Sequence, residues 1–135
     1  MLTNQYVACV NQELERLLVF ETVFKEYLHT CKNIEKGNCY ASENFDRLRL
    51  YLSKNILRYN RFVEQCARIT APSGYETFNQ RLIEGLRGIK NGVTMTLRAI
   101  EPDRLNTRLF DAGMAQQVEA RADIDAAFAQ IEVCV

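Results

Sequence analysis

The sequence predicts an all-α protein, namely an antiparallel, up-down-up-down four-helix bundle that forms one domain over residues 1–135. Three observations lead to this expectation. Apolar residues recur at spacings of three and four through most of the chain, and strand-type alternation is absent. The two prolines both fall between such stretches. A chain of 135 residues with 47% hydrophobic residues is also long enough to bury its own core.

Helix-breaking residues divide the chain into four segments, expected at residues 3–36, 42–71, 74–101 and 103–134. Gly37 suits the position after the C-cap of the first helix. Pro72 ends the second, and Ser73 with Glu76 has the capping-box spacing that starts the third. Pro102 is expected in the first turn of the fourth. Short connections make consecutive helices antiparallel neighbours.

Each segment carries one apolar stripe that is expected to face the core. Val10, Leu17 and Phe24 belong to the stripe of the first segment, and the other segments follow the same spacing. The fourth stripe is rich in alanine, and Gly113 within it is a candidate break in the helix.

Charge and cysteine content exclude several classes of protein. Seventeen basic and seventeen acidic residues cancel, which argues against nucleic acid as a partner. The five cysteines are odd in number, contain no C-x-x-C, and are accompanied by one histidine, so neither a disulfide framework nor a metal site is expected. No apolar run is long enough for a membrane span. These observations favour a cytoplasmic protein without a cofactor.

Polar residues interrupt the apolar stripes near the middle of the helices. Glu21, Asn55 and Gln117 are predicted to lie at one level of the bundle, beside glycines on one flank of the third helix. One interpretation is close approach of the alanine-rich fourth helix. The other is a small-ligand pocket, because ligand sites in bundle cores are built from facing side chains. The candidate pocket residues are Glu21, Asn55, Gly85, Gly88, Gly92 and Gln117.

The single histidine, His29, is predicted to face solvent late in the first helix. The string His29-Thr30-Cys31-Lys32-Asn33 resembles the His-x-Leu-Lys-Gly phosphoacceptor motif of histidine-containing phosphotransfer domains, with Cys31 and Asn33 replacing leucine and glycine. The resemblance covers these five residues and implies that His29 accepts a phosphoryl group steadied by Lys32. Glu26-x-x-His29 has the spacing of a di-metal motif but points away from the core, so no metal is expected.

Two helices carry more apolar surface than a bundle buries. The surplus on the first and fourth helices is expected to merge into one patch, and such patches mark association. The sequence therefore predicts a homodimer through a face formed by Val19, Val23, Met114, Val118 and Val133.

The second helix has an outer face on which two leucines lie among basic residues. Such a face suits an acidic or amphipathic partner helix. The candidate partner face consists of Arg47, Leu50, Lys54, Leu57, Arg58 and Arg61.

The function expected from the sequence is non-catalytic. No nucleophile, base and orienting group are spaced as catalysis requires, and no phosphate-binding loop occurs. The sequence favours an intracellular protein-interaction or adaptor bundle that associates with itself. Phosphotransfer through His29 and binding of a small ligand in the mid-bundle pocket are the alternatives.

Overall fold

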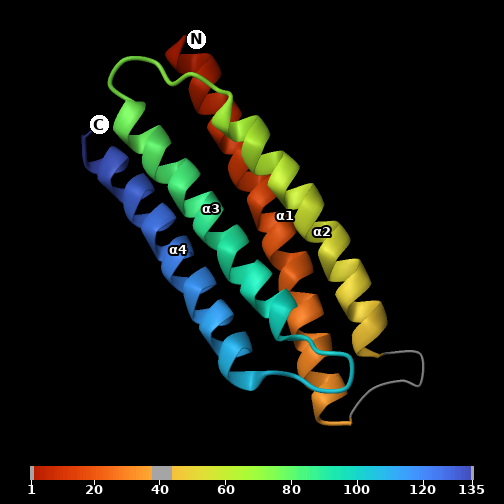
Figure 1. The fold of residues 1–135 in the computed structure, drawn as a ribbon. Helices are drawn as coiled ribbons and strands as arrows, with labels where there is room; N and C mark the ends of the chain where they lie inside the picture. The colour runs from red at the N-terminus through yellow and green to blue at the C-terminus, as the bar shows by residue number, and fades with distance from the viewer. Residues whose placement is uncertain (1, 38–43, 135) are drawn as a thin grey trace.

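The computed structural model of the chain has four α-helices that lie side by side and alternate in direction (Figure 1). The structure describes residues 2–37 and 44–134, with side chains described as far as residue 131. No strand occurs within those ranges, where Ile100 and Leu105 form an isolated bridge. The predicted fold class is therefore confirmed. The helices are α1 (Thr3–Glu35), α2 (Phe45–Ala67), α3 (Glu76–Ala99) and α4 (Thr107–Cys134).

The ends of the first three helices lie near the predicted breaks, with two corrections. Helix α2 ends at Ala67, five residues before Pro72, so Pro72 does not end it as predicted. Gly37 has φ +76°, which ends α1 in the left-handed region that glycine tolerates. Asn44 caps α2 by accepting a hydrogen bond of 2.9 Å from the backbone N–H of Arg47. The Ser73–Glu76 capping box is wrong: α3 begins at Glu76, whose carboxylate accepts from the backbone N–H of Gly74 instead.

The start of α4 also differs from the prediction. Pro102 lies in the turn before the helix, because the N–H of Asn106 donates to the carbonyl of Ala99 at 2.8 Å and folds the chain back. The side chain of Asn106 then accepts from the N–H of Leu109 at 3.2 Å and caps the first turn. The helix runs through Gly113 without a break.

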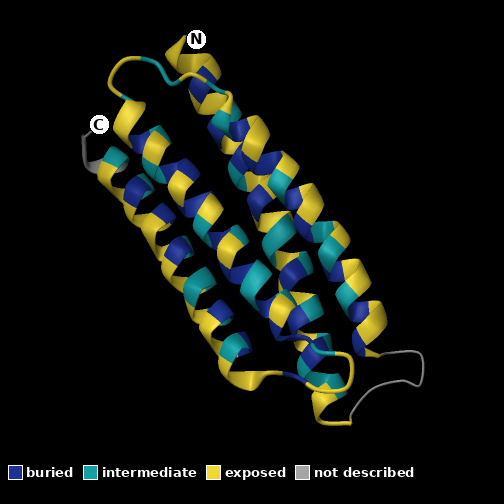
Figure 2. Cartoon of the chain, in the orientation of Figure 1, coloured by how far each residue is buried: buried dark blue, intermediate teal, exposed yellow. Residues whose placement is uncertain are grey.

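Aromatic side chains from α1 and α2 fill the middle of the core. The ring of Tyr59 contacts Phe20, Phe24 and Phe62, with ring centroids 5.2 to 5.8 Å apart. Its hydroxyl donates to the backbone carbonyl of Leu86 at 2.8 Å, which links α2 to α3. Burial raises the pKa of this hydroxyl well above its ordinary value. The buried residues form stripes on the inner sides of the helices (Figure 2).

Helices α3 and α4 pack more closely than any other pair, because small residues line their contact. A Cβ at Gly92 would lie 2.8 Å from the carbonyl oxygen of Gly113, and one at Gly113 would lie 2.6 Å from the carbonyl oxygen of Gly92. A Cβ at Gly88 would meet the side chain of Ala120 at 2.8 Å. The glycines of α3 therefore allow the backbones of α3 and α4 to come into contact, as expected if small residues serve close approach of the fourth helix.

The burial of the Glu13 carboxyl group leads to a first testable prediction. Its Oε2 atom has no hydrogen-bond partner among the described residues, and burial raises the pKa of the group above its ordinary value. Between its ordinary and its raised pKa, the folded protein holds a proton that the unfolded chain releases, so stability falls as pH rises through this window. We expect Glu13→Gln to stabilise the fold at pH 7 by roughly 1 kcal/mol.

The measurement is urea unfolding of both proteins at pH 7 and at pH 3.5. At pH 3.5 Glu13 is protonated in the folded and unfolded chains alike, so the variant and the parent are expected to have the same stability. A variant that is less stable than the parent at pH 7 would contradict the prediction.

Candidate functional site

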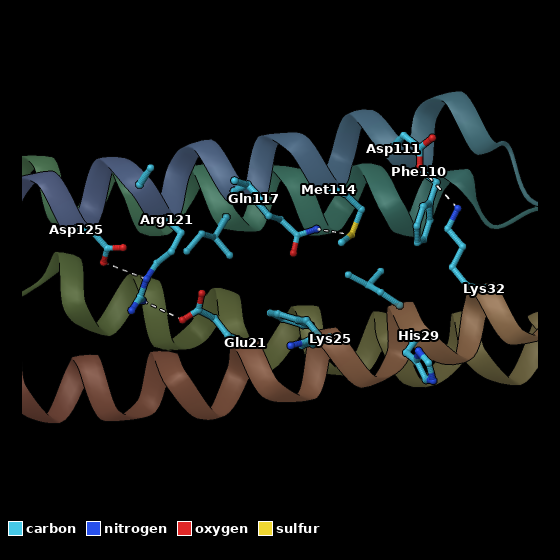
Figure 3. A pocket seen from close by; sticks show the side chains of 15 residues that line it. Glu21, Lys25, His29, Lys32, Phe110, Asp111, Met114, Gln117, Arg121 and Asp125 are labelled. Atoms are coloured by element: carbon cyan, nitrogen blue, oxygen red, sulfur yellow. Dashed lines mark hydrogen bonds and ion pairs between the residues drawn. The ribbon is translucent and has the colours of Figure 1, made fainter.

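An elongated groove of about 840 Å³ lies between α1 and α4, where the two helices hardly approach each other (Figure 3). Its floor is apolar and comes from three helices, with Phe24 and Leu28 on α1, Ile89 on α3 and Phe110 on α4. Met114 and Val118 form part of the α4 wall. The groove exists because α4 packs against α3 and leaves the flank of α1 uncovered.

One ion pair bridges the groove near the middle of the bundle. Arg121 on α4 reaches Glu21 on α1, with Nη1 and Oε1 2.9 Å apart, and its Nε lies 3.2 Å from a carboxylate oxygen of Asp125 (Figure 3). Burial raises the pKa of Glu21, while the guanidinium of Arg121 opposes the shift. The guanidinium closes one end of the apolar floor.

A second bridge spans the groove closer to the α3–α4 turn. The Nζ atom of Lys32 lies 3.7 Å from Oδ1 of Asp111 and 4.8 Å from the centre of the Phe110 ring. Attraction to the carboxylate and to the face of the ring hold the lysine over the groove. Charged pairs of both signs therefore border an apolar centre.

The structure brings together only part of the predicted ligand pocket. Glu21 and Gln117 both line the α1–α4 groove. Asn55 lies elsewhere, because its side chain donates to the hydroxyl of Tyr27 at 3.0 Å and to the carbonyl of Tyr51. Tyr27 follows Glu21 by about 9 Å of helix rise, so the polar positions are not at one level. Gly85, Gly88 and Gly92 lie against α4 and border no part of the groove.

His29 is exposed and lies at the rim of the groove, with its ring directed away from α4 (Figure 3). The cation that the phosphotransfer resemblance assigns to the phosphate is Lys32, which contacts Asp111 and Phe110 instead. A carboxylate in that position repels a phosphoryl group. Phosphotransfer through His29 stays a prediction.

The residues of the predicted dimer face lie on two separate surfaces, one in the α1–α4 groove and the other on the opposite flank of α1. Met114 and Val118 lie on the α4 wall of the groove. Val23 shares its face of α1 with Phe20, which lies three residues earlier and packs its ring on Phe62 of α2. Val19 is exposed on the same side. The side chain of Val133 lies outside the described residues.

The predicted partner face on α2 is a continuous exposed surface. Leu50 and Leu57 are 54% and 58% exposed, and every basic residue of the face is exposed with them. The buried residues of α2 lie on the opposite side of the helix, toward α1 and α3.

Sequence reasoning missed the cations that border the groove. Arg121 lies four residues after Gln117 on the same face of α4, and Lys25 lies four residues after Glu21 on α1. This four-residue spacing from the predicted pocket residues was the sequence signal that could have identified both cations. Leu18, one turn before Glu21 and 49% exposed, extends the same flank of α1 with an apolar residue.

Neither metal-binding clusters nor membrane-spanning helices occur in the part of the chain that the structure describes. There, no three histidine, cysteine, aspartate or glutamate side chains are grouped so that they would hold a metal ion. No helix in those residues combines the length and apolar character needed to cross a bilayer. Comparison with protein-family models, curated proteins and solved structures found no match to this chain.

Proposed function

We propose that this chain is a non-catalytic protein-interaction module whose α1–α4 groove receives the apolar face of a partner helix. The observation that carries the proposal is the unfilled space between α1 and α4, in a bundle whose consecutive helices pack against each other. An amphipathic helix laid into an apolar groove is a recurrent mode of recognition between proteins.

The dimensions and charges of the groove support a helix as its occupant. The α1 wall runs from Glu21 to Lys32, which is about 16 Å and matches three turns of a partner helix. Val118 is 68% exposed on the α4 wall and offers an apolar contact to the partner. Both signs of charge border the floor, so polar residues beside the partner's apolar stripe find opposite charges and fix its direction.

Site-specific photo-crosslinking tests the proposal in the cells that produce the protein. Benzoylphenylalanine placed at Val118 is expected to yield a discrete adduct with a partner protein, because this residue borders the groove. The matched control is Val19, which is 65% exposed but lies on the α2 flank of α1. Adducts of equal yield at both positions, or at Val19 alone, would overturn the proposal.

A small apolar ligand is the second candidate occupant. It is favoured by the groove volume of about 840 Å³, which lies within the range of small-molecule sites. The apolar fluorophore N-phenyl-1-naphthylamine would then bind once per chain, and Val118→Glu would abolish binding while Val19→Glu would not. Native mass spectrometry distinguishes the candidates, since a stored ligand adds a small defined mass and a partner helix does not.

We also propose a cytoplasmic location, with which free thiols in the core agree. Cys31 and Cys66 are free and buried, and burial raises their pKa to about 11 and about 12. Such thiols resist oxidation and act as small apolar residues of the core. Cys39 and the side chain of Cys134 lie outside the described residues.

A further inference from the structure

The outer face of α2 repeats a pattern at intervals of seven residues. Leu50 and Leu57 are one such interval apart, and both are more than half exposed. A row of basic residues runs beside them at the same interval, formed by Arg47, Lys54, Arg61 and Arg68. Regular intervals of seven are the pattern of a helix that packs along another helix. In Figure 2 exposed residues follow the outer side of this helix.

Three cations on the outer side of α2 are not neutralised by the described residues. Among the described residues, no carboxylate lies within ion-pair distance of Arg58, Arg61 or Arg68. Residues 37–72, which include α2, carry six basic and three acidic side chains. The face therefore combines apolar knobs with a surplus of positive charge.

The outer face of α4 has the complementary composition. Ala115, Ala122 and Ala129 are exposed at intervals of seven, which leaves shallow spaces along the helix. Glu119 and Asp123 flank this alanine row, are exposed, and have no cation within ion-pair distance in the described residues. Residues 102–135 carry six acidic and three basic side chains.

We infer that the outer face of α2 of one copy docks on the outer face of α4 of a second copy. The two leucines of α2 match the interval of the α4 alanines, so each leucine finds a space between small residues. The charges of Arg58, Arg61 and Arg68 on α2 attract those of Glu119 and Asp123 on α4. A second copy of this chain carries the complementary face. The excess of positive charge in residues 37–72 equals the excess of negative charge in residues 102–135, on a chain of zero net charge.

The geometry makes this contact head-to-tail. In Figure 1 α2 and α4 lie at opposite edges of the bundle, with α1 and α3 between them. A copy that donates its α2 face keeps its own α4 face free for a third copy, so the contact extends into open chains and does not close as a dimer. The inference deepens the proposed interaction function and uses a face that borders the groove at Ala122, while Met114, Gln117 and Arg121 of the groove take no part.

Sedimentation equilibrium of the purified chain at low and high salt tests the inference. At 0.02 M salt the average mass is expected to rise with concentration beyond twice 15.6 kDa without a plateau. At about 0.5 M salt it is expected to return toward the monomer, because screening removes the attraction between exposed charges. A monomer under all conditions, or a plateau at the dimer, would overturn the inference.

Two variants, each lacking charges of one face, distinguish this head-to-tail contact from a symmetric one. Arg58→Gln with Arg61→Gln removes charge from α2, and Glu119→Gln with Asp123→Asn removes charge from α4. Each variant alone is expected to associate roughly tenfold more weakly than the parent. Mixed together, they are expected to form a 1:1 complex that stops at twice the monomer mass, because each retains the face that the other lacks.

Charge-matched controls distinguish a local effect from a change in net charge. Lys36→Gln with Arg98→Gln removes two exposed cations from other surfaces and is expected to associate as the parent does. Equal weakening by this control, or a mixture of the two face variants that stays monomeric, would overturn the inference. Because Val118 lies one turn before Ala122, a Val118 adduct of twice the monomer mass reports this contact, whereas an adduct with another protein reports the groove partner. Failure of this inference therefore leaves the groove proposal standing.

Discussion

Replacing Gly92 by alanine is expected to destabilise the fold by about 2 kcal/mol, although alanine is the better helix former by about 1 kcal/mol. The added Cβ would lie 2.8 Å from the carbonyl oxygen of Gly113 and 2.9 Å from the backbone nitrogen of Gln117. These are backbone atoms of α4, which cannot turn aside as a side chain does. The helices must separate, and the core between them loses contacts. Urea unfolding followed by circular dichroism measures the change.

The neighbouring residue and the facing glycine provide the controls. Asn91 is exposed on the same turn of α3, so Asn91→Ala is expected to stabilise the helix by about 0.5 kcal/mol. Gly113→Ala is expected to cost as much as Gly92→Ala, and the double variant less than the sum, because one separation of the helices relieves both clashes. If Gly92→Ala stabilised the protein as Asn91→Ala does, the glycines would not set the distance between α3 and α4.

The fold was predictable because its signals are local and repeated. Apolar intervals of three and four marked all four helices, and the bend at Gly37 marked the end of the first one. The errors arose where two local solutions compete. The carboxylate of Glu76 was expected to accept from the backbone N–H of Ser73, but it accepts from that of Gly74. Pro102 suits a turn as well as the first turn of a helix, and it lies in the turn.

The groove could not be predicted because it depends on unequal distances between helices. Counting residues from the loops assumed equal spacing and placed Asn55 at the level of Glu21, whereas Asn55 meets Tyr27. The small residues that draw α4 onto α3 also draw it away from α1. Sequence patterning gave the residues of that close contact, but the space left on the other side of α4 follows only from the assembled bundle.

The largest loss of stability is expected from Tyr59→Ala, at about 4 kcal/mol. Tyr59 is fully buried, and its ring is packed between Phe20, Phe24 and Phe62, so truncation leaves a cavity enclosed by rings that cannot collapse into it. Tyr59→Phe keeps the ring and removes only the hydrogen bond to Leu86, for about 1 kcal/mol. Two unfolding measurements therefore separate the packing of α1 on α2 from the polar link to α3.

Tyr51 is the matched control, since it is an exposed tyrosine on the same helix. Its replacement by alanine removes the same atoms from the surface and is expected to change stability by less than about 0.5 kcal/mol. Because burial raises the pKa of Tyr59, the folded protein keeps a phenolic proton that the unfolded chain releases above about pH 10, and stability falls there. Tyr59→Phe removes this group, so its stability is expected to fall less steeply above pH 10 than that of the parent. Tyr6, Cys31 and Cys66 also have raised pKa values, so both proteins lose some stability at high pH. An equal fall in both would show that ionisation of Tyr59 does not contribute to it.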